Sequence, residues 1–381
     1  MRVENCELRN AFPESLAISG AWGYIGRRFL DAALRLGIKV FVHDPGPVPG
    51  DLAAGAVTRI TDEAAFYRLD ADLFHLALHP EQRARALQWL LERGGDAPVL
   101  ILNEKPMALP ETPEACRRIL DSVDRSQAVM LYDFPELFDP LTRKIIAHLR
   151  RFDDVRITSM YVQRSKDRED PEIPRNHKRM VSIQFQESVH CVAFVVNLLA
   201  RLRGGLDGVF ADGLSVTARA EPYVPPNPRA YPHAVDGRCR YTLRLGEVTV
   251  EGLTDFKRGA EPTKRRVIKG VADGRPFTIE ADYQEGAKQF VIDGVRQDHD
   301  PSTDSYVEVL RTLAKWRERV SPSELMHGLY PNPSFARLTY QLSGVLWRAG
   351  YDRGDIRLGS RAELESFVSG YGDTIRAPSS E

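Results

Sequence analysis

Near the N-terminus, three glycines spaced three residues apart lie between an apolar run and an amphipathic stretch of helical length. The apolar run is 16–19, the glycines are Gly20, Gly23 and Gly26, and the expected helix covers 24–36. Glycine has no Cβ, so such a turn can bring its backbone close to another group. The N–H groups and the dipole at the start of the following helix favour an anion. The sequence therefore predicts a phosphate-binding turn here.

An acidic residue further along the chain indicates which phosphate compound the turn holds. Asp44 follows the second expected strand (38–43) and stands 18 residues after Gly26. A carboxylate at this place accepts hydrogen bonds from the ribose hydroxyls of a dinucleotide and repels a 2′-phosphate. We therefore expect NAD as the cofactor in preference to NADP.

The remaining pattern predicts two domains of different texture. Further apolar runs at 57–60, 73–78, 99–102 and 128–132 alternate with helical stretches, which indicates a Rossmann domain with a parallel sheet (α/β). After about residue 153, strands joined by turn signals predict an open, mostly antiparallel sheet with helices on one face (α+β). We expect a Rossmann domain over 1–151 and a substrate-binding and oligomerisation domain over 152–381, whose terminal helices pack back on the Rossmann domain.

Composition excludes several classes of protein. The formal net charge is −1, so the charge balance does not indicate nucleic acid or an anionic membrane as a partner. The hydrophobic fraction of 43% is typical of a globular protein. No apolar run suits a signal peptide or a bilayer span. The cysteines are far apart, which argues against zinc and disulfides; they are Cys6, Cys116, Cys191 and Cys239. We expect a soluble cytoplasmic protein without a metal.

A second motif follows the fifth expected strand. Glu104-Lys105-Pro106 stands between the strand at 99–102 and a helix at 113–124. In this order of elements the chain resembles the Gfo/Idh/MocA family of oxidoreductases, whose hallmark is Glu-Lys-Pro at this place. The resemblance implies that Lys105 hydrogen-bonds the reacting oxygen of the substrate and the nicotinamide ribose. It also implies a homodimer or homotetramer.

With the resemblance, the expected cofactor contacts extend over several strand ends. They are Gly20, Trp22, Gly23, Tyr24, Ile25, Gly26, Asp44, His79, Glu104 and Lys105.

The family's other motif, Asp-x-Gly-x-His, is altered in this chain. Gln186 stands in place of the aspartate, Ser188 in place of the glycine, and His190 is retained. A neutral His190 could accept or relay the substrate's proton, with Glu187 or Tyr161 as helpers. Alternatively, His190 is a core histidine on an apolar helix (188–203).

The expected substrate pocket departs from the family in two more ways. The segment 135–140 keeps Phe138 and Pro140 but lacks the family's arginine. A basic stretch at 175–179 could bind a carboxylate or phosphate of the substrate, or it could be a solvated loop. The substrate pocket has therefore diverged more than the cofactor pocket, and the family's sugar specificities do not transfer.

These observations favour an NAD(P)-dependent dehydrogenase or ketoreductase acting on a sugar, nucleotide sugar or cyclitol. One alternative is a redox-neutral enzyme, epimerase- or glycosidase-like, that holds its NAD tightly. Another is a cofactor-binding regulatory protein that has lost catalysis. Extended short-chain dehydrogenases are disfavoured, because Tyr67, Tyr132 and Tyr161 have no lysine four residues later.

Overall fold

The structure is a computed structural model and describes residues 12–93 and 98–368. The chain divides into two compact units, each assembled from three stretches. The first unit holds the described residues up to Ala108, then Ala115–Phe138 and Asp304–Ala336. The second unit holds Leu109–Glu114, Asp139–Thr303 and the described residues from Arg337 onward. The predicted division at residue 151 has two continuous stretches and stays a prediction, while each compact unit is assembled from separated stretches.

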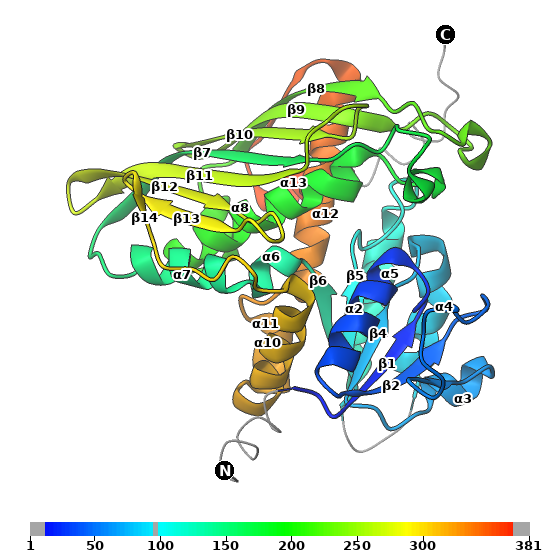
Figure 1. Cartoon of the computed structure of the whole chain (residues 1–381). Helices are drawn as coiled ribbons and strands as arrows, with labels where there is room; N and C mark the ends of the chain where they lie inside the picture. Colours follow the sequence, from blue (N-terminus) through cyan, green and yellow to red (C-terminus); the bar gives the residue numbers. More distant parts are fainter. Residues whose placement is uncertain (1–11, 94–97, 369–381) are drawn as a thin grey trace. The chain divides into compact units, whose positions relative to one another are not determined.

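The first unit contains a six-stranded parallel sheet with the order β3-β2-β1-β4-β5-β6 (Figure 1). The strands are β1 (Ser15–Ser19), β2 (Lys39–His43), β3 (Thr58–Arg59), β4 (Leu73–Leu76), β5 (Leu100–Glu104) and β6 (Val129–Asp133). From β1 the chain adds β2 and β3 on one side, and from β4 it adds β5 and β6 on the other side. Dinucleotide-binding sheets have the same order, and their ligands bind between these two halves, at the carboxyl ends of the strands. The predicted Rossmann sheet is confirmed.

The helices of the first unit bury apolar faces against this sheet. They are α2 (Tyr24–Arg35), α3 (Glu63–Tyr67), α4 (Pro80–Leu91), α5 (Glu114–Asp124), α6 (Pro135–Phe138), α10 (Ser305–Arg319) and α11 (Pro322–His327). Phe29 and Leu30 of α2 share one buried cluster with Leu310 and Leu313 of α10. The late segment that carries α10 therefore belongs to the core of the first unit.

The second unit contains a nine-stranded sheet with the order β14-β13-β12-β11-β7-β10-β9-β8-β15. The strands are β7 (Val155–Ser165), β8 (Leu214–Pro222), β9 (Asp236–Leu245), β10 (Val248–Asp255), β11 (Thr263–Ala272), β12 (Arg275–Asp282), β13 (Gln289–Ile292), β14 (Val295–Arg296) and β15 (Asp355–Leu358). The ladders are antiparallel except between β7 and β10, which run parallel. The predicted mostly antiparallel sheet is confirmed, while β14 and β15 come from the structure alone.

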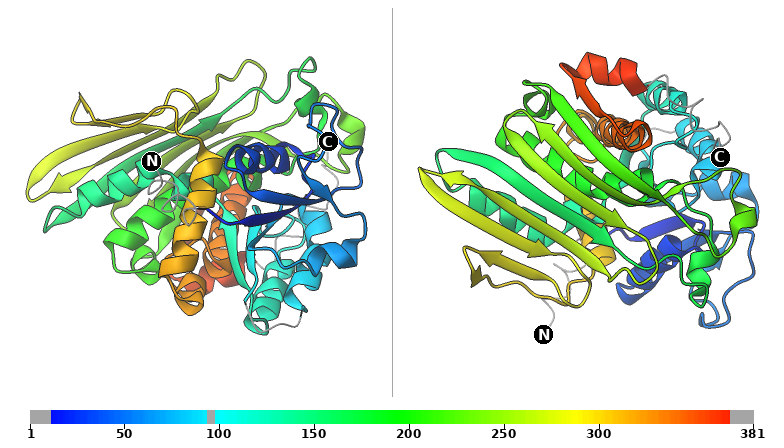
Figure 2. Two further views of the ribbon diagram at one scale, coloured as in Figure 1. Left: turned by 60° about the horizontal axis from the view of Figure 1, so that its bottom comes forward. Right: turned by 90° about the horizontal axis from the view of Figure 1, so that it is seen from above.

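Helices lie on one face of this sheet, as predicted (Figures 1 and 2). The helices of this unit are α7 (Pro140–Leu149), α8 (Val189–Leu202), α9 (Leu206–Val209), α13 (Arg361–Val368) and most of α12 (Pro333–Asp352). Arg266 of β11 lies over the Phe194 ring of α8, 5.5 Å from its centroid. Gly252 of β10 leaves room for the ring of Tyr241, since a Cβ there would lie 2.0 Å from a ring carbon.

Two kinds of feature, membrane-spanning helices and metal-binding clusters, are absent from the described residues. No helix in 12–93 or 98–368 is long and apolar enough to cross a membrane. Over the same residues, no three His, Cys, Asp or Glu side chains gather in a way that could hold a metal ion.

Candidate functional site

The glycine turn after β1 packs closely against backbone carbonyl groups. Gly20 has a φ of +79°, and its N–H donates to the carbonyl of His43 at 3.0 Å. A Cβ at Gly20 would lie 2.6 Å from the carbonyl oxygen of Ala77, and a Cβ at Gly26 would lie 2.2 Å from that of Gly20. Both separations are shorter than any real contact, so only glycine fits at these two positions.

The helix that follows starts without a side-chain cap. Gly23 is the N-cap residue of α2, and no side chain accepts a hydrogen bond at this end of the helix. The first turn, which begins with Tyr24 and Ile25, also has no acidic residue. An uncapped helix start with close backbone access suits the pyrophosphate of a dinucleotide, because the N–H groups and the helix dipole then meet an anion. The residues present therefore fit the predicted cofactor.

Asp44 joins the glycine turn to the segment after β2. One carboxylate oxygen accepts the Trp22 N–H at 3.0 Å, and the other accepts the Gly46 N–H at 2.9 Å. Arg59 donates to the backbone carbonyls of Asp44 and Gly46, each at 3.0 Å. Each carboxylate oxygen can accept a second hydrogen bond, so Asp44 keeps acceptor capacity for ribose hydroxyls. Trp22 takes part in this contact through its backbone N–H, which donates to Asp44.

The other residues predicted to contact the cofactor lie at or just after the carboxyl ends of β4 and β5. His79 is the N-cap residue of α4, with its Nδ1 3.6 Å from a carboxylate oxygen of Glu81. Glu104 is buried and its Oε1 lies 3.2 Å from Nε2 of His75. Lys105 is half-buried, and the peptide bond between it and Pro106 is cis. These positions remain predictions as cofactor contacts.

A buried arginine holds the Glu104-Lys105-Pro106 segment and was missed by the sequence interpretation. Arg83 of α4 is 2% exposed and donates to the Pro106 carbonyl and, at 3.4 Å, to Oδ1 of Asn103. Burial lowers the pKa of Arg83 to about 10, opposed by the nearby Tyr132 and Glu104. Its place in α4 gives no local signal, because an arginine in a helix usually faces solvent.

In the second unit, the altered motif lies on a π-helical turn that directly precedes α8. The π turn covers Gln184–Ser188, and its side chains reach the ends of three neighbouring strands. The amide of Gln184 donates to Asp236 of β9 at 2.8 Å, and the Ser188 hydroxyl lies 2.8 Å from that of Thr254 in β10. π-helical turns are rare in proteins, and those that do occur are often found at functional sites.

Glu187, the third polar residue of the π turn, is paired with two cations from the end of β7. Its Oε2 lies 2.7 Å from Nε of Arg164, and its Oε1 lies 2.8 Å from Nζ of Lys166. The Glu187 side chain is only 5% exposed. Burial lowers the pKa of Lys166 to about 7; Glu187 opposes this effect, whereas Arg175 and Arg164 add to it. Glu187, predicted as a helper of His190, is thus held in an ion-pair network.

His190 and Tyr161, the other predicted catalytic residues of this unit, have different surroundings. His190 is buried in the first turn of α8, and its role as an acid or base stays a prediction. Tyr161 donates its hydroxyl to Gln163 at 2.8 Å. Side chains alternate along β7, so Tyr161 and Gln163 lie on the sheet face opposite to Arg164. The role of Tyr161 as a helper of His190 stays a prediction.

The basic stretch 175–179 is partly folded into the second unit. It overlaps a short 3₁₀ turn, Pro174–His177, in which Asn176 is buried and donates to the Asp170 carbonyl at 2.9 Å. Arg168 donates to the carbonyls of Arg175 and Lys178, at 3.3 and 3.5 Å. These bonds hold the backbone of the stretch beside the end of β7.

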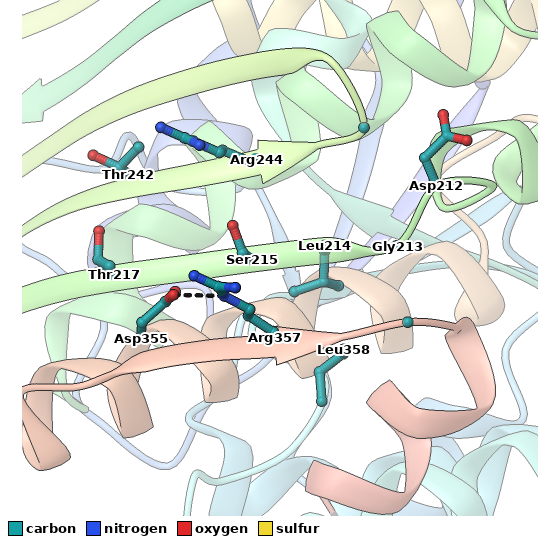
Figure 3. A pocket seen from close by; sticks show the side chains of 12 residues that line it. Asp212, Gly213, Leu214, Ser215, Thr217, Thr242, Arg244, Asp355, Arg357 and Leu358 are labelled. Carbon is teal, nitrogen blue, oxygen red and sulfur yellow. Dashed lines mark hydrogen bonds and ion pairs between the residues drawn. The ribbon is translucent and has the colours of Figure 1, made fainter.

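A cavity of about 730 Å³ lies elsewhere in the second unit (Figure 3). It is lined by side chains of β8, β9 and β15, among them Ser215, Thr242 and Arg244. Arg357 and Asp355, 2.8 Å apart, pair along one side of it. None of the residues predicted to be functional lines this cavity.

No family model matches the chain, and no curated protein matches it in sequence. Solved structures do match. A myo-inositol dehydrogenase from Corynebacterium glutamicum is 15% identical over 90% of this chain and 98% of that one, with a TM-score of 0.60. An aldose-aldose oxidoreductase from Caulobacter crescentus is 13% identical over 90% and 99%, with a TM-score of 0.64. The transcriptional regulator Gal80p from Kluyveromyces lactis is 10% identical over 94% and 98%, with a TM-score of 0.60.

Proposed function

We propose that this chain, whose two units have the fold of the Gfo/Idh/MocA oxidoreductases, is an NAD-dependent dehydrogenase or ketoreductase of a polyhydroxylated small molecule. The fold confirms the resemblance that Glu104, Lys105 and Pro106 predict. The glycine turn is the observation that carries the proposal. At Gly20 and Gly26 a Cβ would strike backbone, and the turn leads into a helix start that no side chain caps.

The first unit would hold the cofactor through its backbone and one carboxylate. The start of α2 would bind the pyrophosphate, and Asp44 would accept hydrogen bonds from the adenosine ribose. The negative charge of Asp44 favours NAD over NADP, since it repels a 2′-phosphate. When bound, NAD supplies the acceptor or donor of the hydride.

The side chains of Lys105 and His190 would handle the substrate's oxygen and proton. The ammonium of Lys105 would donate a hydrogen bond to the hydroxyl oxygen and stabilise negative charge as the carbonyl forms. His190 would take the hydroxyl proton on a ring nitrogen and return it in the reverse direction. Arg83 would fix the Lys105 segment through the Pro106 carbonyl.

The test combines binding of NAD with turnover. Calorimetry should detect NAD binding to the full chain, and a panel of sugars and cyclitols should change the absorbance at 340 nm. Lys105→Ala should lower kcat by about 100-fold or more, the usual range for losing a group that acts on the substrate's proton and oxygen. Lys315→Ala, at an exposed position of α10, is the control. Unchanged kcat in Lys105→Ala would contradict the assigned role.

Two other functions fit particular observations. NAD that copurifies, with turnover but no net change at 340 nm, would favour redox-neutral chemistry. A regulatory protein is favoured by Gln186 and Ser188 in the altered motif and by the similarity to Gal80p. Binding of NAD and a sugar without turnover or isotope exchange would favour the regulator.

A further inference from the structure

The cations at the end of β7 are close to one another and to one aromatic ring. Besides its bond to Glu187, Lys166 lies over the ring of Phe256, with Nζ 4.8 Å from the centroid. The guanidinium carbon of Arg168 lies 5.9 Å from the same centroid. Arg164 and Lys166 share the two oxygens of Glu187. Arg164, Lys166, Arg168 and Arg175 are called the Lys166 cluster below.

Two carboxylates that neighbour the cluster in the sequence make their hydrogen bonds and ion pairs to groups outside it. Asp167 accepts backbone N–H groups of Glu169, Asp170 and Gly259 at 2.7 to 3.0 Å. The carboxylate of Glu169 pairs with Lys257, 2.6 Å away. Glu187 is the carboxylate that pairs with Arg164 and Lys166, whereas the carboxylates of Asp167 and Glu169 bind other groups.

Arg168 adds a buried charge that its surroundings only partly satisfy. It is 6% exposed, its Nη2 donates to the backbone carbonyls of Arg175 and Lys178, and its Nε has no partner within the described residues. Burial lowers the pKa of Arg168, and the nearby Arg175 lowers it further. Burying charge of one sign is costly unless an opposite charge accompanies it, so this position favours an anion.

We propose that the Lys166 cluster binds an oxyanion, a carboxylate or a phosphate, carried by the polyhydroxylated substrate. Lys166 is the contacting group. Its side chain is 27% exposed, and its ammonium has three N–H donors, one of which bonds Glu187. The more deeply buried Arg164 and Arg168 add positive potential without needing to reach the ligand.

This inference rests on the proposed function, because it concerns the same substrate as His190. Glu187 precedes His190 by three residues, within one turn of the continuous π turn and α8. An oxyanion at Lys166 would therefore hold the substrate's charged end beside the predicted proton acceptor.

The experiment compares matched anionic and neutral probes on the full chain loaded with NAD. Gluconate and glucuronate test carboxylates, glucose 6-phosphate tests phosphate, and glucose and myo-inositol are the neutral counterparts. Calorimetry gives the affinities, and absorbance at 340 nm gives turnover. At least one anionic probe should bind about tenfold or more tightly than its neutral counterpart, and this preference should weaken with added salt.

Variants assign the preference to the cluster. Lys166→Gln should reduce the preference for the anionic probe about tenfold while leaving NAD binding unchanged. Lys269→Gln, at an exposed position of β11, should leave both unchanged. Equal binding of neutral and anionic probes, or no binding of any anionic probe, would overturn the subsite. So would a preference that Lys166→Gln leaves intact. Anion binding without turnover would instead remove the proposed function and leave the subsite standing.

Discussion

The two candidate binding sites are built differently. The glycine turn of the first unit offers backbone groups to a ligand, whereas the end of β7 in the second unit offers side chains. Gly20 and Gly26 act by having no side chain, and a Cβ at either would strike a carbonyl oxygen. Glu187 acts through its carboxylate, which joins Arg164 and Lys166 across different elements. A backbone site tolerates almost no change at its glycines, while a side-chain site can be retuned one residue at a time. This difference fits a constant cofactor and a variable substrate.

The largest effect is expected in the backbone site. Gly26→Ala places a Cβ 2.2 Å from the Gly20 carbonyl oxygen, so either the turn or α2 must shift. We expect a loss of about 3 kcal/mol in the free energy of unfolding and loss of measurable NAD binding. Urea denaturation and calorimetry measure the two. Gly50→Ala is the matched control, since a Cβ there meets nothing within 4 Å. Full NAD binding by Gly26→Ala would show that the turn is not the cofactor site.

The next largest effect should come from the carboxylate at the end of β7. Glu187→Ala leaves Arg164 and Lys166 without their shared partner in a largely buried position. Breaking such a pair costs about 3 kcal/mol of stability, and Glu187→Gln should cost less because it keeps the volume and one acceptor. Glu251→Ala, an exposed carboxylate of β10, should change the urea midpoint little. Equal costs for Glu187→Ala and Glu251→Ala would mean that the network contributes nothing.

The contrast between the two sites also decides how much could be predicted from the sequence. The turn is local: a strand, three glycines and a helix follow one another, so spacing alone identifies it. Arg83 and the partners of Glu187 come together only through strand register and helix packing, which one sequence does not reveal. Arg164, Lys166 and Arg168 stand at every second position, a usable signal because alternate side chains of an extended chain share a face, although β7 ends at Ser165. The strand β15 carries no such signal, because it has only four residues and two of them are exposed.

A moderate effect on NAD binding is expected at Asp44, whose side chain accepts a hydrogen bond from the glycine turn. Asp44→Ala removes the acceptor for the Trp22 and Gly46 N–H groups and the negative charge beside the ribose. We expect NAD to bind about tenfold more weakly and the preference for NAD over NADP to shrink. Calorimetry with both dinucleotides measures this, with Asp70→Ala as an exposed control in the same unit. An unchanged ratio of the two affinities would remove Asp44 as the selectivity residue.

The smallest effect is a pH dependence of stability that only the side-chain site should produce. Burial lowers the pKa of Lys166 from 10.5 to about 7, so between these pH values the unfolded chain binds more protons than the folded chain. Stability from this group therefore rises as the pH is raised from about 7 toward 10.5, and the rise is modest because solvent reaches about a quarter of the side chain. Urea midpoints between pH 7 and pH 9.5 should rise less in Lys166→Met than in the parent chain. Parallel curves for the two proteins would mean that Lys166 keeps its ordinary pKa. The Lys166 cluster would then lack the unfavourable burial of positive charge that favours binding of an anion there.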